Sequence, residues 1–118
     1  MQENMPFQNL ITELRRGSLT MAVLSCLNNP HYGYALLQTL QEVGVAIDAN
    51  TLYPLLRRLE SQGLLTGNWD TTESRPRKYY TVNESGREAL SVLTSEWESM
   101  QRCMAQIYKE VDRGEKSS

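Results

Sequence analysis

The sequence is poor in the residues that most often carry out chemistry. Its 118 residues include one histidine and two cysteines, and it contains no glycine-rich phosphate loop. The cysteines, Cys26 and Cys103, lie far apart with no partner at metal-ligand spacing, which is typical of reduced thiols in a cytosolic protein. No Ser-His-Asp or Cys-His pairing occurs at an interpretable spacing. We therefore expect no enzymatic activity, no metal site and no cofactor.

Long hydrophobic runs are missing as well. No apolar stretch approaches the roughly 20 residues that span a bilayer, and the first ten residues lack the basic and apolar regions of a secretion signal. Hydrophobic residues nevertheless make up 40% of the chain, which is enough for a packed core. The length fits one domain of common size. We expect a cytoplasmic protein that has no membrane partner.

Positive charge is scarce overall but concentrated in the middle of the chain. The net charge is −2. Residues 50–82 hold five basic and three acidic side chains, whereas the segments before and after them are both net acidic. Salt limits the reach of each charge to roughly 8–10 Å, so a local basic patch can bind a polyanion even on an acidic protein. The same five charges are equally compatible with a solvated surface.

Apolar residues at helical spacing predict four short helices before residue 63. Gly17, Gly44 and Gly63 are typical of helix ends, and "NNP" at residues 28–30 stops a helix as well. The expected helices cover residues 7–16, 18–27, 33–43 and 48–62. The last of these contains Pro54, which lies in the second helical turn if Asp48 caps the helix and in the first turn if Asn50 or Thr51 does.

The chain after residue 63 predicts a hairpin and then one long helix. The stretches "LLTGNWD" and "RKYYTV" are β-rich and are separated by the turn-forming "TTESRP", and Asn83 is suited to cap a helix that runs to about Asp112. Compact helices followed by a hairpin make a winged helix-turn-helix, whose helix pair is 33–43 and 48–62. The expected fold is mainly α with a small β-hairpin. It divides into a DNA-binding unit at 1–82, a dimerisation helix at 83–112 and a disordered tail at 113–118.

The chain resembles the PadR family of bacterial transcriptional regulators in four stretches. They are "LRRGSLTMAVLSCL", "HYGYALLQTL", "NTLYPLLRRLESQGLL" and "RPRKYYTVNESGREAL", between about residues 14 and 90. The single C-terminal helix is similar to that of the smaller members of the family. The resemblance implies a homodimeric DNA-binding repressor that releases its operator when it binds a small molecule.

The outward face of the predicted recognition helix, residues 48–62, carries hydrogen-bonding side chains. A major groove admits one helix and offers base edges to asparagine and arginine, while wing cations suit phosphates. We predict DNA contacts from Asn50, Thr51, Tyr53, Arg57, Arg75, Arg77 and Lys78. Tyr34 either contacts a phosphate or packs in the core, and Tyr80 and Val82 are expected to point inward. The competing interpretation is a winged helix that binds only protein, although such a module would need no basic wing.

The long helix carries a heptad seam. Its residues are Leu90, Leu93, Trp97, Met100, Met104, Ile107 and Val111. The N-terminal helix of the same chain is too small to cover this stripe, so we expect a two-fold dimer whose interface also includes Ile11 and Leu14. Such a dimer places two recognition helices roughly 34 Å apart, which matches successive major grooves.

Bulky and flexible residues replace leucine in the middle of that seam. Methionine suits adaptable surfaces and tryptophan stacks on planar molecules. Some short PadR-like regulators hold flat aromatic compounds between their subunits near a tryptophan of this helix. That resemblance implies an effector site of Trp97, Met100, Met104, Phe7 and Leu10. An interface tryptophan without any ligand accounts for the same residues.

Overall fold

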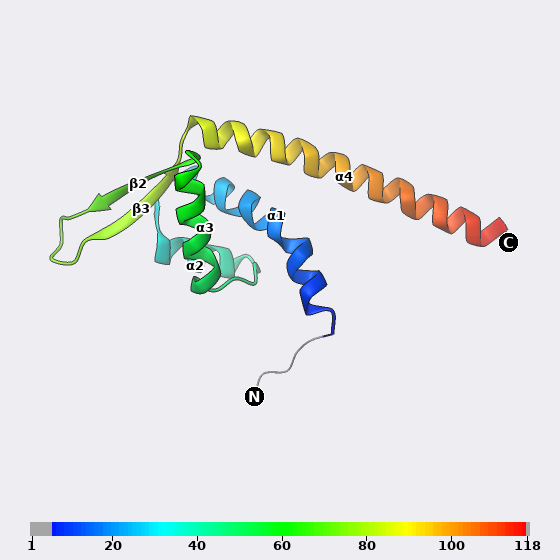
Figure 1. Ribbon diagram of the computed structural model, residues 1–118, viewed down its shortest axis with the longest axis horizontal. Coiled ribbons are helices and arrows are strands. Elements are labelled where there is room, and N and C mark those ends of the chain that lie inside the picture. Colours follow the sequence, from blue (N-terminus) through cyan, green and yellow to red (C-terminus); the bar gives the residue numbers. More distant parts are fainter. Residues whose placement is uncertain (1–5, 118) are drawn as a thin grey trace.

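The computed structural model describes residues 6–117, and the side chains of residues 6–114. In chain order its elements are α1 (Gln8–Cys26), β1 (His31–Tyr32), α2 (Gly33–Glu42), α3 (Ala49–Ser61), β2 (Leu65–Asp70), β3 (Arg77–Val82) and α4 (Glu84–Ser117). Figure 1 shows α1, α2 and α3 clustered beside the β2–β3 hairpin, while α4 extends away from them. The predicted fold class, a mainly helical winged helix-turn-helix, is confirmed.

The two helices of the helix-turn-helix pair, α2 and α3, both end in the same glycine-based turn. Gly44 and Gly63 have φ angles of 96° and 81°, which glycine adopts without steric cost. After Gly63, the N–H of Leu64 donates to the carbonyl of Leu59 at 2.9 Å, and the corresponding bond after Gly44 is equally short. This arrangement is the Schellman motif, which satisfies the last helical carbonyls. The predicted ends of both helices are confirmed.

Asp48 caps α3, the predicted recognition helix. Its Oδ1 accepts a hydrogen bond from the N–H of Thr51 at 3.0 Å. The earlier of the two possible starts is therefore the observed one, and Pro54 lies in the second turn. Because proline has no N–H, the carbonyl of Asn50 lacks its helical donor. Asn50 and Pro54 are both exposed, so water can solvate that carbonyl.

A leucine-rich core joins α1, α2 and α3 to the inner face of the sheet. Its most deeply buried side chains are Val23, Leu24, Leu27, Leu36, Leu40, Leu52, Leu56 and Leu59. Tyr80 and Val82 are buried against them, as predicted. Each aliphatic side chain of this size contributes roughly 1.5–3 kcal/mol by leaving water. The core thereby fixes where α3 and the hairpin lie relative to each other.

α1 is one helix where the sequence predicts two. Gly17 does not adopt a positive φ angle, and the hydroxyl of Ser18 donates to the carbonyl of Arg15 at 2.9 Å instead of capping a new helix. A glycine inside a helix costs about 1 kcal/mol relative to alanine, and α1 continues through Gly17 despite this cost. The prediction of a break at Gly17 is therefore wrong.

Two further differences concern β1 and the end of α4. β1 pairs with β3 through Tyr32 and Tyr79, which makes a three-stranded sheet in the order β1-β3-β2. α4 continues through Ser117, whereas the sequence predicts disorder over 113–118. Arg113 lies 3.6 Å from Glu110, an i,i+3 pair that supports the helix beyond its predicted end. Residue 118 lies outside the described residues.

The start of α4 is tied to the end of α3 by a single asparagine. The side chain of Asn83 donates to the carbonyl of Gly63 at 3.0 Å and accepts from the N–H of Gly86 at 2.8 Å. The predicted cap at Asn83 is thus confirmed. Beyond its first turns α4 leaves the core (Figure 1). Within the described part of the chain, none of the helices combines the length and apolar character that a bilayer crossing requires.

Candidate nucleic-acid interface

The outer face of α3 is polar and open to solvent. Asn50, Thr51 and Arg57 are exposed on it, because the leucines that alternate with them turn toward the core. Among the described residues, neither Arg57 nor Arg75 of the hairpin tip has an ion-pair partner. These two guanidinium groups are therefore available to an anion without breaking an existing pair.

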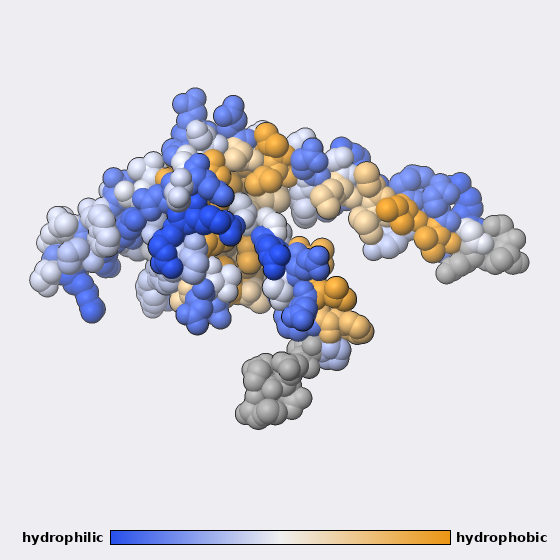
Figure 2. Space-filling view, in the orientation of Figure 1, coloured by the Kyte–Doolittle hydropathy of each residue, from blue (hydrophilic) through white to orange (hydrophobic). Residues whose placement is uncertain are grey.

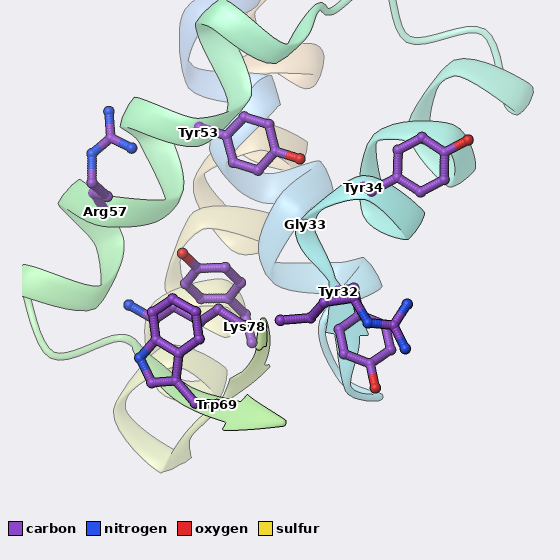
Figure 3. Close-up of a pocket in the computed structure, with 9 residues that line it drawn as sticks. Tyr32, Gly33, Tyr34, Tyr53, Arg57, Trp69 and Lys78 are labelled. Carbon is purple, nitrogen blue, oxygen red and sulfur yellow. The ribbon is translucent and has the colours of Figure 1, made fainter. Parts of the chain in front are cut away.

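Two tyrosines that the sequence assigns to DNA differ in their surroundings. Tyr34 is 66% exposed, and its hydroxyl accepts a hydrogen bond from Gln38 at 3.1 Å. It does not pack in the core, which removes one of its two interpretations. Tyr53 is half-buried, with its ring against Gly33 at the start of α2 (Figure 3).

One face of the wing carries a linked group of polar and aromatic side chains. The hydroxyl of Tyr32 donates to Asp70, and the guanidinium of Arg77 lies 4.2 Å above the Tyr32 ring. The hydrogen bonds from Tyr32 and then from Thr72 lower the pKa of Asp70 to about 2. The same bond to Asp70 raises the pKa of Tyr32. Arg77 also lies 3.8 Å from the exposed Glu73, so its charge is already partly balanced.

Lys78, which the sequence assigns to phosphate, is turned toward α3. Its ammonium donates to Glu60 at 2.9 Å, and this bond raises the pKa of Lys78. Strand alternation contains the signal for this orientation, because Lys78 shares a face with the core residues Tyr80 and Val82.

A cleft of about 440 Å³ lies between α2, α3 and the wing. Tyr53 and Arg57 line it from α3, and Trp69 and Lys78 line it from the hairpin (Figure 3). Aromatic rings offer apolar faces, and cations attract phosphate oxygens. The cleft therefore has the chemistry for a sugar-phosphate backbone that passes between a helix and a wing.

A second, apolar groove lies between α1 and α4. It has a volume of about 540 Å³ and is lined by Leu14, Met21, Trp97, Met100, Met104 and Tyr108 among others. Figure 2 shows hydrophobic surface on the first half of α1 and along the edge of α4 on the same side. The seam residues beyond Leu93 are all exposed in one copy of the chain: Trp97 47%, Met100 62%, Met104 42%, Ile107 50% and Val111 54%.

Of the residues assigned to an effector, the structure brings only three to this groove. Trp97, Met100 and Met104 line it, but Phe7 and Leu10 do not. α1 continues through Gly17 as one helix, and its first turns lead away from α4 (Figure 1). Phe7 and Leu10 are 74% and 61% exposed there. Met21 and Tyr108 take their place, and both follow the helical spacing of residues already assigned to the seam.

The described residues contain no cluster of metal-ligating side chains. No group of three or more His, Cys, Asp and Glu side chains is placed to hold a metal ion within residues 6–114. Cys26 and Cys103 are free thiols, and burial raises the pKa of Cys26.

Known proteins share this architecture and much of this sequence. The model of the transcriptional regulator PadR-like family matches residues 23–92. A transcriptional regulator from Mycobacterium tuberculosis is 34% identical over 80 residues, which cover 67% of this chain and 75% of the relative.

Two solved structures extend the similarity to most of the chain. A PadR family transcriptional regulator from Eggerthella lenta is 47% identical with a TM-score of 0.79, covering 84% of this chain and 88% of the other. A PadR-like transcription factor from Bacteroides fragilis is 31% identical with a TM-score of 0.72, covering 85% and 99%. These relatives are regulators of transcription, so the prediction that the chain is not an enzyme is confirmed.

Proposed function

Because the chain belongs to the PadR-like family of transcriptional regulators, we propose that it is a homodimeric repressor that reads an operator through α3 and the wing. The observation that carries this proposal is the juxtaposition of an open polar helix face with unpaired cations. Asn50 and Arg57 are exposed on α3, Arg57 also lines the cleft, and Arg75 is exposed at the tip of the hairpin. A helix of this kind fits a major groove, and the wing cations suit the flanking phosphates.

Arg57 and Arg75 are expected to give different signatures when each is changed to glutamine. Loss of a base contact at Arg57 weakens operator binding by about 5- to 150-fold and relaxes the preference at one base pair. Loss of a phosphate contact at Arg75 weakens all sequences alike and lowers the salt slope by about one. Titration of DNA at several salt concentrations measures both effects. Arg102→Gln on α4 is the matched control, since this exposed arginine lies far from the cleft.

The competing function is a winged helix that binds only protein. It predicts affinity for DNA below the non-specific range even at low salt. It also predicts that Arg57→Gln and Arg75→Gln leave the weak residual binding unchanged. A steep fall of wild-type affinity with rising salt contradicts it.

The dimer part of the proposal rests on apolar surface that one copy leaves open. Exposed side chains of α4 continue at heptad spacing from Trp97 to Val111, and Phe7, Leu10 and Leu14 form a second exposed row on α1. Large exposed apolar stretches of this kind are typical of interfaces. A second copy, with its α4 antiparallel across the seam and against α1, buries both rows by two-fold symmetry.

The effector part rests on the groove between α1 and α4. Its volume of about 540 Å³ falls within the range of small-molecule sites, and Trp97 and Tyr108 offer flat apolar faces. We propose that a small planar hydrophobic compound binds here, at the dimer centre, and lowers the affinity for the operator. Trp97, Met100 and Met104 are the residues assigned to this contact.

Trp97 is expected to report the effector by its fluorescence. In a Trp69→Phe background, which removes the other tryptophan, planar hydrophobic compounds are expected to quench Trp97. Over the same concentration range they should release DNA bound by the wild-type protein. The Trp97→Ala variant should bind DNA but should respond to those compounds at least about tenfold less strongly. An absence of quenching across a broad panel argues for an interface tryptophan without a ligand.

A further inference from the structure

We propose that Glu60 of α3 and Lys78 of β3 form a clamp that sets the angle between the wing and the recognition helix. Lys78 then serves DNA binding as a positioning residue and does not itself contact phosphate. The inference rests on the proposed DNA-binding function. It assigns to one cation of the basic wing a role different from that of Arg75.

The ion pair of the clamp is more enclosed than the other pairs in the described residues. The Nζ of Lys78 lies 2.9 Å from the Oε1 of Glu60, and the two side chains are 26% and 31% exposed. The side chains of the Arg77–Glu73 and Arg113–Glu110 pairs are 48–68% exposed. Solvent screens an enclosed pair less. The clamp also joins two elements of the fold, whereas each of the other pairs links residues three or four apart in sequence.

Gly67 makes room for the clamp. It pairs with Tyr80 across the hairpin, and the next pair on the same face is Trp69 with Lys78. A Cβ on Gly67 would lie 2.5 Å from the Cε of Lys78 and 2.7 Å from the Oε2 of Glu60. The backbone at Gly67 has no positive φ angle, so conformation does not require glycine there. Since glycine weakens a strand, the space that it leaves is the physical reason for its presence.

Aromatic rings hold the lysine across that space. Its Nζ lies 5.2 Å from the centre of the Tyr80 ring and 5.8 Å from that of Trp69. A cation within about 6 Å of an aromatic face is attracted to it. Figure 3 shows Trp69 and Lys78 side by side at the edge of the cleft. The ammonium of Lys78 is thus held by Glu60 and by the two rings.

A clamp and a phosphate contact differ in how the charge of Glu60 is balanced when DNA binds. A carboxylate at Glu60, next to a DNA-binding cleft, repels the backbone unless a cation balances it. A lysine that leaves Glu60 to bind phosphate exposes that carboxylate and loses its own pair. A clamp, in contrast, is neutral as a unit and releases no counterion when DNA binds.

The test compares Glu60→Gln, Lys78→Gln and Gly67→Ala, with Thr66→Ala as a control on the exposed face of the same strand. The first readout is hydrogen exchange of residues 65–82 without DNA. The second is affinity, at several salt concentrations, for the strongest duplex that the wild-type protein selects from a random-sequence pool. The alanine at Gly67 keeps every charge and displaces only the flexible ends of two side chains, so the variant is expected to fold.

We expect all three variants to exchange faster over residues 65–82 and to bind the duplex roughly 3- to 10-fold more weakly, with the salt slope unchanged. Weaker binding by Glu60→Gln is the decisive result, because removal of a negative charge alone should strengthen binding. The charge-swapped double variant, Glu60→Lys with Lys78→Glu, should regain part of the lost affinity. Thr66→Ala should match the wild type in both readouts.

Two results overturn the clamp. One is tighter binding by Glu60→Gln together with a salt slope lowered by about one in Lys78→Gln, which makes Lys78 a phosphate ligand. The other is unchanged hydrogen exchange in all three variants. Failure of the wild-type protein to select any duplex overturns the proposed function instead, and the exchange experiment then still decides whether the clamp holds the wing.

Discussion

Gly86→Ala is expected to lower the free energy of unfolding by about 3 kcal/mol, near the upper end for an overpacked site. Gly86 is buried in the first turn of α4. A Cβ there would collide with the backbone carbonyl oxygen of Leu64 and with a methyl group of Val82. The carbonyl belongs to the turn that ends α3 and cannot move as a side-chain tip can.

The sign of this effect opposes helix propensity. Alanine in a helix is about 1 kcal/mol more favourable than glycine, so propensity alone predicts a more stable protein. Denaturant unfolding at fixed protein concentration measures the difference, because the stability of a dimer depends on concentration. Gly114→Ala is the control within the same helix, since nothing lies within 4 Å of a Cβ at Gly114. Equal stability of Gly86→Ala and the wild type would mean that α4 can shift away from Leu64 at little cost.

Met104→Glu is expected to convert the proposed dimer to monomers and to weaken operator binding by at least about 100-fold. Met104 lies in the middle of the seam, and a carboxylate buried there without a partner is strongly unfavourable. Two linked recognition helices bind two half-sites with an effective-concentration advantage of about 10²–10⁴. A monomer loses that advantage while its own winged helix remains intact.

Sedimentation and binding to full and half operators separate the two effects. Ser95→Glu introduces the same charge on the opposite side of α4 and should leave the dimer and the affinity unchanged. Met104→Glu should bind a half operator as weakly as the wild type does, because the recognition surface is untouched. A Met104→Glu protein that remains dimeric would place the interface elsewhere on the molecule.

Local patterns in the sequence were sufficient to predict the elements that present the proposed DNA-binding surface. The spacing of leucines and the glycines at 44 and 63 predicted α2 and α3 correctly, because both helices satisfy their ends with neighbouring residues. The hairpin followed from alternation and turn residues for the same reason. A sequence pattern carries information only about the stretch of chain in which it occurs.

Features that depend on distant parts of the chain were missed. β1 is only His31 and Tyr32, too short to show alternation, and it exists because β3 offers it an edge. Lys78 turns toward α3 because it pairs with Glu60, which lies 18 residues earlier in the chain. Both outcomes were decided by a partner that the local pattern does not contain. Gly17 lies inside α1 although glycine is a typical helix end, and nothing in the structure explains why the helix continues there.

Asn83 couples the orientation of α4 to the end of α3. Its bonds to Gly63 and Gly86 fasten the turn that ends α3 to the first turn of a 34-residue helix. A helix of that length measures about 50 Å, so a rotation of only about 5° moves its far end by about 4 Å relative to the recognition helix. In the proposed dimer, small changes in packing along the seam are therefore enlarged into changes in the spacing of the two copies of α3.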